Sequence, residues 1–190
     1  MITAREARFA LYGAYRLARM DPRGLVHFDA TIEGFWRSFY AALLVVPVYV
    51  ILLALDLGDR PATAGPVKLV LVEGIVYVIG WTAFPLAMVY VARWLGRSQH
   101  YIRYIVAQNW ANVLEIALFF SVVAIAVGSA AVAVLPLLLA GIAVLVYEWY
   151  IARTALEITG WQAAAVVALS VILDFIITYI SSGMLRDPAG

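Results

Sequence analysis

Five long apolar segments, separated by short links, dominate the pattern of hydrophobic and polar positions along the chain. They lie at residues 38–56, 67–94, 105–127, 131–152 and 161–181. A transmembrane helix needs about 20 mostly apolar residues to cross a hydrocarbon layer of about 30 Å. Each segment approaches or exceeds that length. The pattern therefore predicts an all-α fold, a polytopic membrane bundle of five transmembrane helices.

Prolines and glycines mark local features within this pattern. Pro47 falls near the middle of the first span, and Pro85 lies within the second. Gly128 is expected at a tight turn between the third and fourth spans. Because that link is short and apolar, an alternative is that these two segments form a re-entrant pair instead of two complete crossings.

The segment before the first span predicts an amphipathic helix. Four arginines recur on one helical face at steps of three or four: Arg5, Arg8, Arg16 and Arg19. Alanines and leucines occupy the opposite face, which suits a helix that lies on an anionic membrane surface. Pro22 and Gly24 then break the pattern. Asp29 is expected to cap a short helix that contains Glu33, and Trp36 is expected at the lipid interface.

The chain thus divides into three parts. Residues 1–37 are expected to form a basic interfacial segment, residues 38–181 the five-helix transmembrane domain, and residues 182–190 a short polar tail. The start lacks the continuous apolar region of a secretory signal, so we expect the first internal span to drive insertion. No internal repeat is visible in the sequence.

Composition supports the membrane class. Of the 190 residues, 65% are hydrophobic and 13% are charged, whereas soluble domains average about 25% charged residues. Cysteine is absent, which excludes disulfides, thiolate metal sites, iron–sulfur ligation and c-type haem attachment.

The distribution of arginine and lysine predicts an orientation. Cytoplasmic segments of membrane proteins carry an excess of both residues. With the N-terminus inside, ten arginines fall on the cytoplasmic side: Arg5, Arg8, Arg16, Arg19, Arg23, Arg37, Arg93, Arg97, Arg103 and Arg153. Only Arg60, Lys68 and Arg186 fall outside. We expect a multi-pass protein of a bacterial cytoplasmic membrane, with its N-terminus inside and its C-terminus outside.

Common catalytic motifs are largely absent from the sequence. The chain lacks a GxxxxGK[ST] phosphate loop, a GxSxG nucleophile elbow and an HExxH metal helix. His27 and His100 are its two histidines, and we expect ordinary interfacial residues there rather than a metal or haem site. The sequence predicts no enzyme, no cofactor and no nucleic-acid partner.

The candidate functional residues are polar side chains within the spans. On the third span, one sector about 120° wide contains four of them, at 100° per residue: Gln108, Asn109, Asn112 and Glu115. The fifth span carries a polar stripe of Ser170, Asp174, Thr178 and Ser181. Glu73 lies on the second span, on a face with Tyr77, and Glu148 lies on the fourth. We expect these groups to form an intramembrane polar seam that faces the bundle interior.

Two interpretations of the seam remain open. Intramembrane amides and hydroxyls commonly join helices, at about 0.6–2 kcal/mol per hydrogen bond. Alternatively, Glu148, Glu115, Asp174 and Glu73 form a ladder for protons or cations, because acidic residues at staggered depths serve such relays. A contact surface for another subunit, a lipid or a pigment is a third possibility.

The stretch "DPRGLVHFDATIEGFWRSFYAALLVVPVYV", residues 21–50, resembles bacterial members of the Yip1-like superfamily. The likeness lies in a cytoplasmic N-terminal segment, an aromatic-rich approach to the membrane and five spans with short links. Eukaryotic members are associated with vesicle membranes and small-GTPase partners, but their "DLYGP" and "YGY" signatures are absent from this chain. The resemblance implies the topology and supplies no catalytic residues.

The functional expectation is a non-enzymatic membrane protein that acts by interaction. Membrane organisation, or an accessory role in a membrane complex, fits the absence of catalytic motifs and the near absence of soluble mass. The expected partners are the lipid bilayer and other membrane subunits or further copies of this chain. The alternative is a small carrier or channel coupled to protons or cations through the acidic ladder.

Overall fold

The computed structural model describes residues 2–58, 65–126 and 130–185, and within these ranges every element of secondary structure is helical. The elements are α1 (Ala4–Ala18), η1 (Pro22–His27), α2 (Ile32–Ser38), α3 (Tyr40–Gly58), α4 (Pro66–Trp94), η2 (Ser98–His100), α5 (Tyr101–Ala126), α6 (Ala130–Leu156) and α7 (Gly160–Leu185). The predicted all-α class is confirmed.

Among the described residues, five helices are long and apolar enough to cross a membrane, as the sequence predicts. The first candidate span includes α2 as well as α3, and α7 continues to Leu185, into the region expected to be a polar tail. The helices α5 and α6 have 26 and 27 residues, about 40 Å at 1.5 Å per residue, which favours two crossings over a re-entrant pair. Gly128, Arg60 and Arg186 lie outside the described residues.

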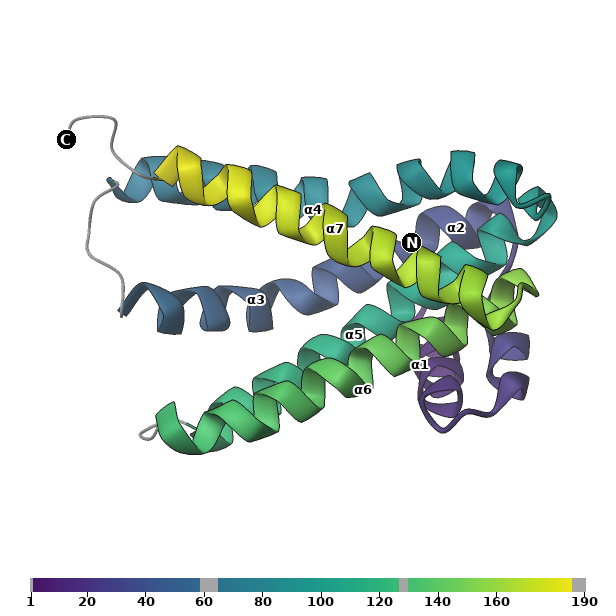
Figure 1. The fold of residues 1–190 in the computed structure, drawn as a ribbon, viewed down its shortest axis with the longest axis horizontal. Helices are drawn as coiled ribbons and strands as arrows, with labels where there is room; N and C mark the ends of the chain where they lie inside the picture. Colours follow the sequence, from purple (N-terminus) through teal and green to yellow (C-terminus); the bar gives the residue numbers. More distant parts are fainter. Residues whose placement is uncertain (1, 59–64, 127–129, 186–190) are drawn as a thin grey trace.

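The long helices converge at one end of the molecule and spread apart at the other (Figure 1). The converging end also carries α1, and we call it the α1 end. The side chains are closely packed there. Buried residues gather there on α5 (Tyr104 to Ala111), α6 (Tyr147 to Leu156) and α7 (Ala163 to Val167). The tight core of the bundle therefore occupies the half nearest α1, and the opposite half is more open.

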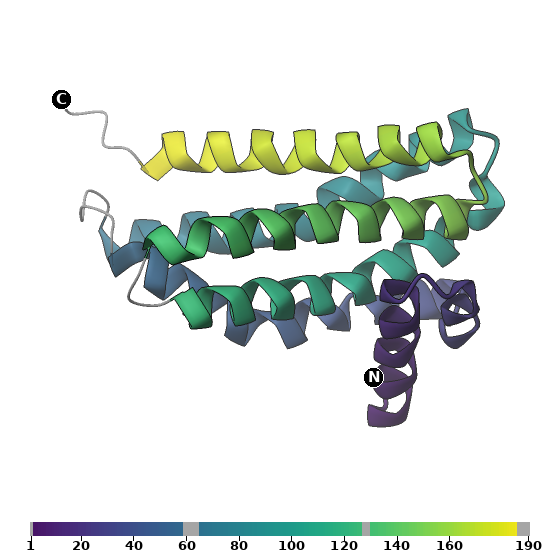
Figure 2. The same ribbon diagram turned by 60° about the horizontal axis from the view of Figure 1, so that its bottom comes forward.

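The helix α1 packs against the bundle near this end and runs roughly perpendicular to the long helices (Figure 2). Its position is fixed by small residues, because Gly13 and Gly24 bring the α1 and η1 backbones so close that a Cβ on Gly24 would lie 2.5 Å from the Gly13 carbonyl oxygen. Two tyrosines of α6 hold its C-terminal half: Tyr147 donates to the Ala14 carbonyl at 2.8 Å, and Tyr150 donates to that of Met20 at 2.7 Å.

The expected use of the two α1 faces needs correction. The alanine-rich face was expected to meet lipid, but Ala10, Ala14 and Leu17 are buried against the protein. The small side chains permit this close packing on α5 and α6. The exposed face alternates arginine and aromatic residues, with the guanidinium groups of Arg5 and Arg19 lying over the rings of Phe9 and Tyr15. This face, rather than the alanine face, is available to the interface.

The start of α2 also differs from the expectation. Thr31, not Asp29, is the N-cap, because its hydroxyl accepts from the Gly34 N–H at 3.0 Å. Asp29 acts one step earlier, since its carboxylate accepts from the backbone N–H and the hydroxyl of Thr31. The Thr31 hydroxyl contributes most to lowering the pKa of Asp29. Asp29 therefore orients the cap rather than providing it.

Candidate functional site

A cavity of about 630 Å³ lies between the five long helices, and each of the five contributes to its wall. Four carboxylates line it, one from each of four helices: Glu73 of α4, Glu115 of α5, Glu148 of α6 and Asp174 of α7. Among the described residues that line it, none is a lysine, arginine or histidine. The cavity is therefore an acidic site placed within the candidate membrane spans.

The inner floor of the cavity is a polar layer around Glu148. Gln108 donates from Nε2 to Glu148 Oε1 at 3.4 Å, and Ser170 donates to Glu148 Oε2 at 3.1 Å. This layer joins α5, α6 and α7. The residues on its α1 side are the buried apolar side chains of the core. The cavity is thus closed toward α1, and its lining continues along α7 through Asp174 and Thr178 to Ser182 at the opposite end.

Glu115 is the most enclosed of the carboxylates. Its Oε1 atom is shielded from solvent and has no hydrogen-bond partner among the described residues. The Asn112 amide donates to Glu115 Oε2 at 3.3 Å and to the Gln108 carbonyl at 3.2 Å. One oxygen of Glu115 is therefore paired within α5, and the other is not.

Asn109 does not belong to the cavity, which corrects the expectation of a single sector on the third span. Its amide donates to the hydroxyl of Ser38 at 2.8 Å, and both side chains are buried. Adjacent residues on a helix point 100° apart, so side chains within the predicted sector can contact two different neighbouring helices. The sector divides: Gln108, Asn112 and Glu115 face α6 and the cavity, whereas Asn109 fastens α5 to the end of α2.

Aromatic side chains form the wall on the α3 and α4 side. Tyr49 donates to Glu73 Oε2 at 2.8 Å, and its ring centroid lies 4.8 Å from that of Tyr77. Tyr77 donates to the Ala42 carbonyl, and Trp81 follows one turn later on α4. Sequence reasoning missed Tyr49 and Trp81. The signal available for Tyr49 was a phenolic hydroxyl deep in an apolar span, which requires a hydrogen-bond partner.

The fifth-span stripe lies where the sequence places it. Asp174, Thr178 and Ser181 line the cavity, and Ser170 reaches Glu148 at its floor. Of the seven predicted seam residues, the structure brings six into or against one cavity, namely Glu73, Gln108, Asn112, Glu115, Glu148 and Asp174.

The two histidines lie apart from the cavity and serve different contacts. His100 Nε2 lies 3.4 Å from Glu157 Oε2, where η2, just before α5, meets the link between α6 and α7. His27 stacks against Phe9 of α1. No three histidine, aspartate or glutamate side chains among the described residues are grouped to hold a metal ion.

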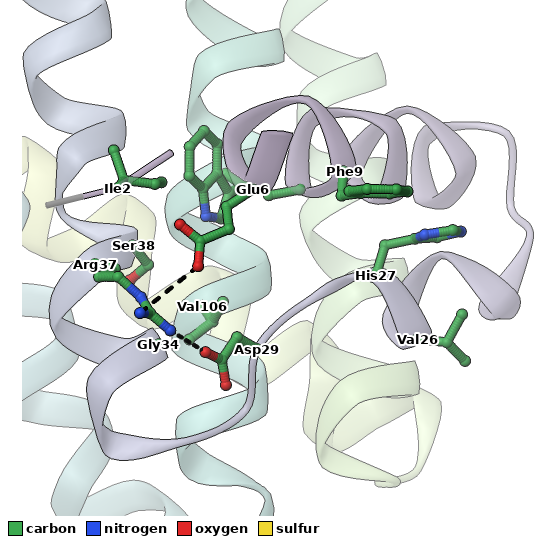
Figure 3. A pocket seen from close by; sticks show the side chains of 12 residues that line it. Ile2, Glu6, Phe9, Val26, His27, Asp29, Gly34, Arg37, Ser38 and Val106 are labelled. Atoms are coloured by element: carbon green, nitrogen blue, oxygen red, sulfur yellow. Dashed lines mark hydrogen bonds and ion pairs between the residues drawn. The ribbon is translucent and has the colours of Figure 1, made fainter. Parts of the chain in front are cut away.

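A second pocket of about 360 Å³ lies beneath α1, between η1, α2 and α5 (Figure 3). Arg37 bridges two carboxylates there: its Nη1 atom lies 3.6 Å from Glu6 Oε1, and its Nη2 atom donates to Asp29 Oδ2. The Thr3 N–H, which donates to Glu6 at 2.8 Å, is the main cause that lowers the pKa of Glu6. Because Arg37 links Glu6 of α1 to Asp29, which precedes α2, this pocket is explained by the docking of α1.

The residues expected at the lipid interface gather near the α1 end. Trp36 is 66% exposed, and Trp94 and Trp161, at the α1-end termini of α4 and α7, are exposed as well. Of the four arginines, Arg16 is engaged by Asp21, to which it donates from Nε at 2.8 Å, and that contact lowers the pKa of Asp21. Arg5, Arg8 and Arg19 are exposed. The tryptophans and arginines therefore mark one interface level.

Comparison with models of known protein families, with curated proteins and with solved structures finds no match. The likeness to Yip1-like proteins stays a prediction from the sequence. The cavity is the feature of this structure that bears on function.

Proposed function

We propose that this protein is a membrane carrier that binds protons or small cations at the acidic cavity and moves them across the bilayer. One observation supports this proposal above the others: four carboxylates from four helices line a single intramembrane cavity in which the described lining residues include no basic side chain. The geometry thus favours the alternative that the sequence analysis placed second.

The negative charge of these carboxylates is costly within a membrane. A carboxylate near the centre of a bilayer costs about 2.5–3.5 kcal/mol even on permissive insertion scales. Glu73 and Glu148 each accept a hydrogen bond from a neighbour, but among the described residues no lysine or arginine lines the cavity beside them. Such groups bind a proton or attract a cation, and a site with that property is suited to coupling the movement of one to the other.

The shape of the cavity favours a carrier over an open channel. Packed side chains close it on the α1 side, and the helices spread at the opposite end (Figure 1). Carriers expose a midplane site to one side at a time. With the orientation predicted from arginine, the proposed carrier has its cavity open to the outside of a bacterial cytoplasmic membrane, as an outward-facing state does.

Reconstitution into liposomes tests the proposal. Liposomes containing a pH-sensitive dye and the wild-type protein should dissipate an imposed pH gradient faster than empty liposomes. Glu115→Gln should reduce that rate about tenfold or more, because it removes the proton-binding group at the centre of the cavity. Glu33→Gln, on the exposed start of α2, is the matched control and should keep the wild-type rate. Equal rates in protein-containing and empty liposomes would contradict the proposal.

A second candidate is the interaction role expected from the sequence, in membrane organisation or as an accessory subunit. It is favoured by α1, which projects from the bundle roughly perpendicular to the long helices (Figure 2). The exposed side chains of α1 include arginines that lie over aromatic rings. Purification in a mild detergent distinguishes it from the carrier. Stable recovery with a larger membrane complex, without proton movement in liposomes, would favour the interaction role.

A further inference from the structure

We propose that the cavity binds an organic cation, a protonated amine carried on an apolar body, and that this ligand exchanges with protons at the cavity carboxylates. The inference rests on the proposed function, because it names the substrate class of the same carrier. Three features of the cavity support it: its size, the spread of its charges and its aromatic wall.

The size of the cavity suits a molecule rather than an ion. Its volume of about 630 Å³ lies within the range of about 300–1,000 Å³ found for small-molecule sites. An inorganic cation such as Ca²⁺ needs about six to eight oxygen atoms converging at about 2.3–2.6 Å. In this cavity Tyr49 holds Glu73 on the α3 side, whereas Gln108 and Ser170 hold Glu148 at the floor.

The carboxylates are consequently distributed over the walls. Among the described residues, no three acidic or histidine side chains converge on a common point. Charges that surround a space of this volume, instead of meeting at one position, complement a ligand whose positive group is attached to a larger body. The four carboxylates also provide more negative charge than a single ammonium group requires, so the remaining groups are available to protons.

The aromatic wall provides the surface for the rest of the ligand. Tyr49 and Tyr77 lie with their ring centroids 4.8 Å apart, and those of Tyr77 and Trp81 are 6.3 Å apart. A cation within about 6 Å of an aromatic ring centroid is attracted by the ring, most strongly by tryptophan. A wall with this composition binds an ammonium group and also shields an apolar body from water.

Two buried acceptors lack a donor, which indicates an N–H group in the ligand. Glu115 Oε1, which belongs to the cavity wall, has no hydrogen-bond partner among the described residues. The same holds for Gln108 Oε1, beside the floor, and Gln108 is only 6% exposed. Leaving a buried acceptor unpaired is costly, so such atoms are usually satisfied when the site is occupied. A protonated amine supplies the missing donors, whereas a quaternary ammonium does not.

Binding of 1-adamantylammonium to the purified protein tests the inference by isothermal titration calorimetry. Two analogues share its apolar body: neutral 1-adamantanol and the N,N,N-trimethyl ammonium, which lacks N–H donors. We expect adamantanol to bind at least about tenfold more weakly and the trimethyl compound to have an intermediate affinity, because a tenfold change corresponds to one lost charged contact. Excess sodium chloride should not displace the amine.

Protons should compete with the amine. The groups that face the cavity are Glu73, Glu115, Glu148 and Asp174, together with the phenols of Tyr49 and Tyr77. The phenols are already protonated at neutral pH, so acidification acts on the carboxylates, and the affinity for adamantylammonium should fall as the pH is lowered. Glu115→Gln and, as an independent variant, Asp174→Asn should each weaken binding about tenfold, and Trp81→Leu should weaken it about threefold or more. Glu33→Gln should bind as the wild type does.

The outcomes separate this inference from the proposed function. If adamantanol binds as tightly as the amine, or if Glu115→Gln and Asp174→Asn both retain wild-type affinity, the inference is wrong. If liposomes show proton movement that depends on Glu115 but the amine does not bind, the carrier stands and the substrate class is wrong. If the amine binds through these carboxylates and no proton movement occurs, the binding site stands and the carrier is wrong.

Discussion

At the scale of single residues, Arg103 illustrates how this chain ends a membrane helix. Its guanidinium donates to the Ala155 carbonyl from Nε at 2.9 Å and from Nη2 at 2.6 Å, and Nη2 also donates to Glu157 Oε1 at 2.8 Å. Glu157 has a φ of 55°, a left-handed conformation that usually favours glycine. The contacts with Arg103 and His100 account for a glutamate at this position, because they compensate the backbone strain with an ion pair.

Protonation of Glu157 should therefore destabilise the corner between α6 and α7. Its hydrogen bond with Arg103 lowers the pKa of Glu157 in the folded protein. A lowered folded-state pKa contributes stability above the usual carboxyl range, and that contribution is lost as the pH falls through the lowered pKa. The melting temperature of the wild type in detergent should exceed that of Glu157→Gln at neutral pH, and the difference should disappear as the pH falls below the lowered folded-state pKa of Glu157.

Glu33→Gln supplies the matched control for this measurement, since it removes an exposed carboxylate elsewhere on the same side of the molecule. Its melting temperature should follow that of the wild type across the same pH range. A Glu157→Gln difference that persists unchanged in acid would show that the side chain stabilises the corner by packing and not by charge.

The inward orientation of a polar side chain could be predicted from the sequence where it depends on helical spacing alone. Glu115 and Asp174 point inward because lipid cannot solvate them. The partners of these groups were not predictable, since they come from other helices. Asn109 shares the predicted sector with Gln108 but bonds Ser38, 71 positions earlier in the chain. Tyr49 becomes a site residue only because the packing of α3 on α4 places it beside Glu73.

At the scale of elements, α1 depends on close contact with η1. Glycine at both Gly13 and Gly24 is what permits this contact, because an added Cβ on either would approach the backbone of the other within 2.8 Å. Gly24→Ala should therefore detach or displace α1, at a cost of about 1–3 kcal/mol, the usual cost of inserting a methyl group into a tightly packed site.

Limited proteolysis in detergent, together with the melting temperature, measures this effect. Cleavage within α1 should become faster in Gly24→Ala while the five long helices stay protected. Gly74→Ala is the control, since a Cβ at Gly74 meets nothing within 4 Å, and its α1 should remain resistant. Equal resistance of α1 in the two variants would mean that the η1 contact does not hold the helix.

The existence and approximate ends of the long helices could be predicted because apolar length is a strong signal. The predicted second span, 67–94, differs from α4 by one residue at its start. The role of α1 could not be predicted in the same way. Its amphipathic pattern is the same whether the alanine face meets lipid or protein, and only the glycine contact with η1 and the tyrosines of α6 decide between them.

At the scale of the whole molecule, the main feature is the contrast between a packed α1 end and a spread opposite end. Packing is close where small residues such as Ala107, Ala111, Ala152 and Ala155 bring α5 and α6 together. The carboxylates and aromatic rings lie beyond this region, where the helices have separated (Figure 1). No sequence pattern specifies where helices diverge, so the cavity emerges only from the assembled bundle.

The absence of cysteine makes the orientation directly measurable. A cysteine at Gln99, exposed in the link between α4 and α5, should be protected from a membrane-impermeant maleimide in intact cells and should react after permeabilisation. A cysteine at Ser182, at the open end of the cavity, should react in intact cells. The expectation follows from the excess of arginine on the Gln99 side. The reverse pattern of labelling would place the cavity mouth in the cytoplasm.

The hydrogen bond between Tyr147 and Ala14 has a consequence for the order of assembly. The two residues are 133 positions apart, so α1 leaves the ribosome long before the helix that holds it exists. At about 5–20 residues per second, this delay is on the order of ten seconds. During that interval α1 can pack on η1 and then on α5, but its C-terminal end lacks the tyrosine contacts until α6 has been inserted. The bonds from Tyr147 and Tyr150 therefore complete the docking of α1 only after the fourth crossing is in place.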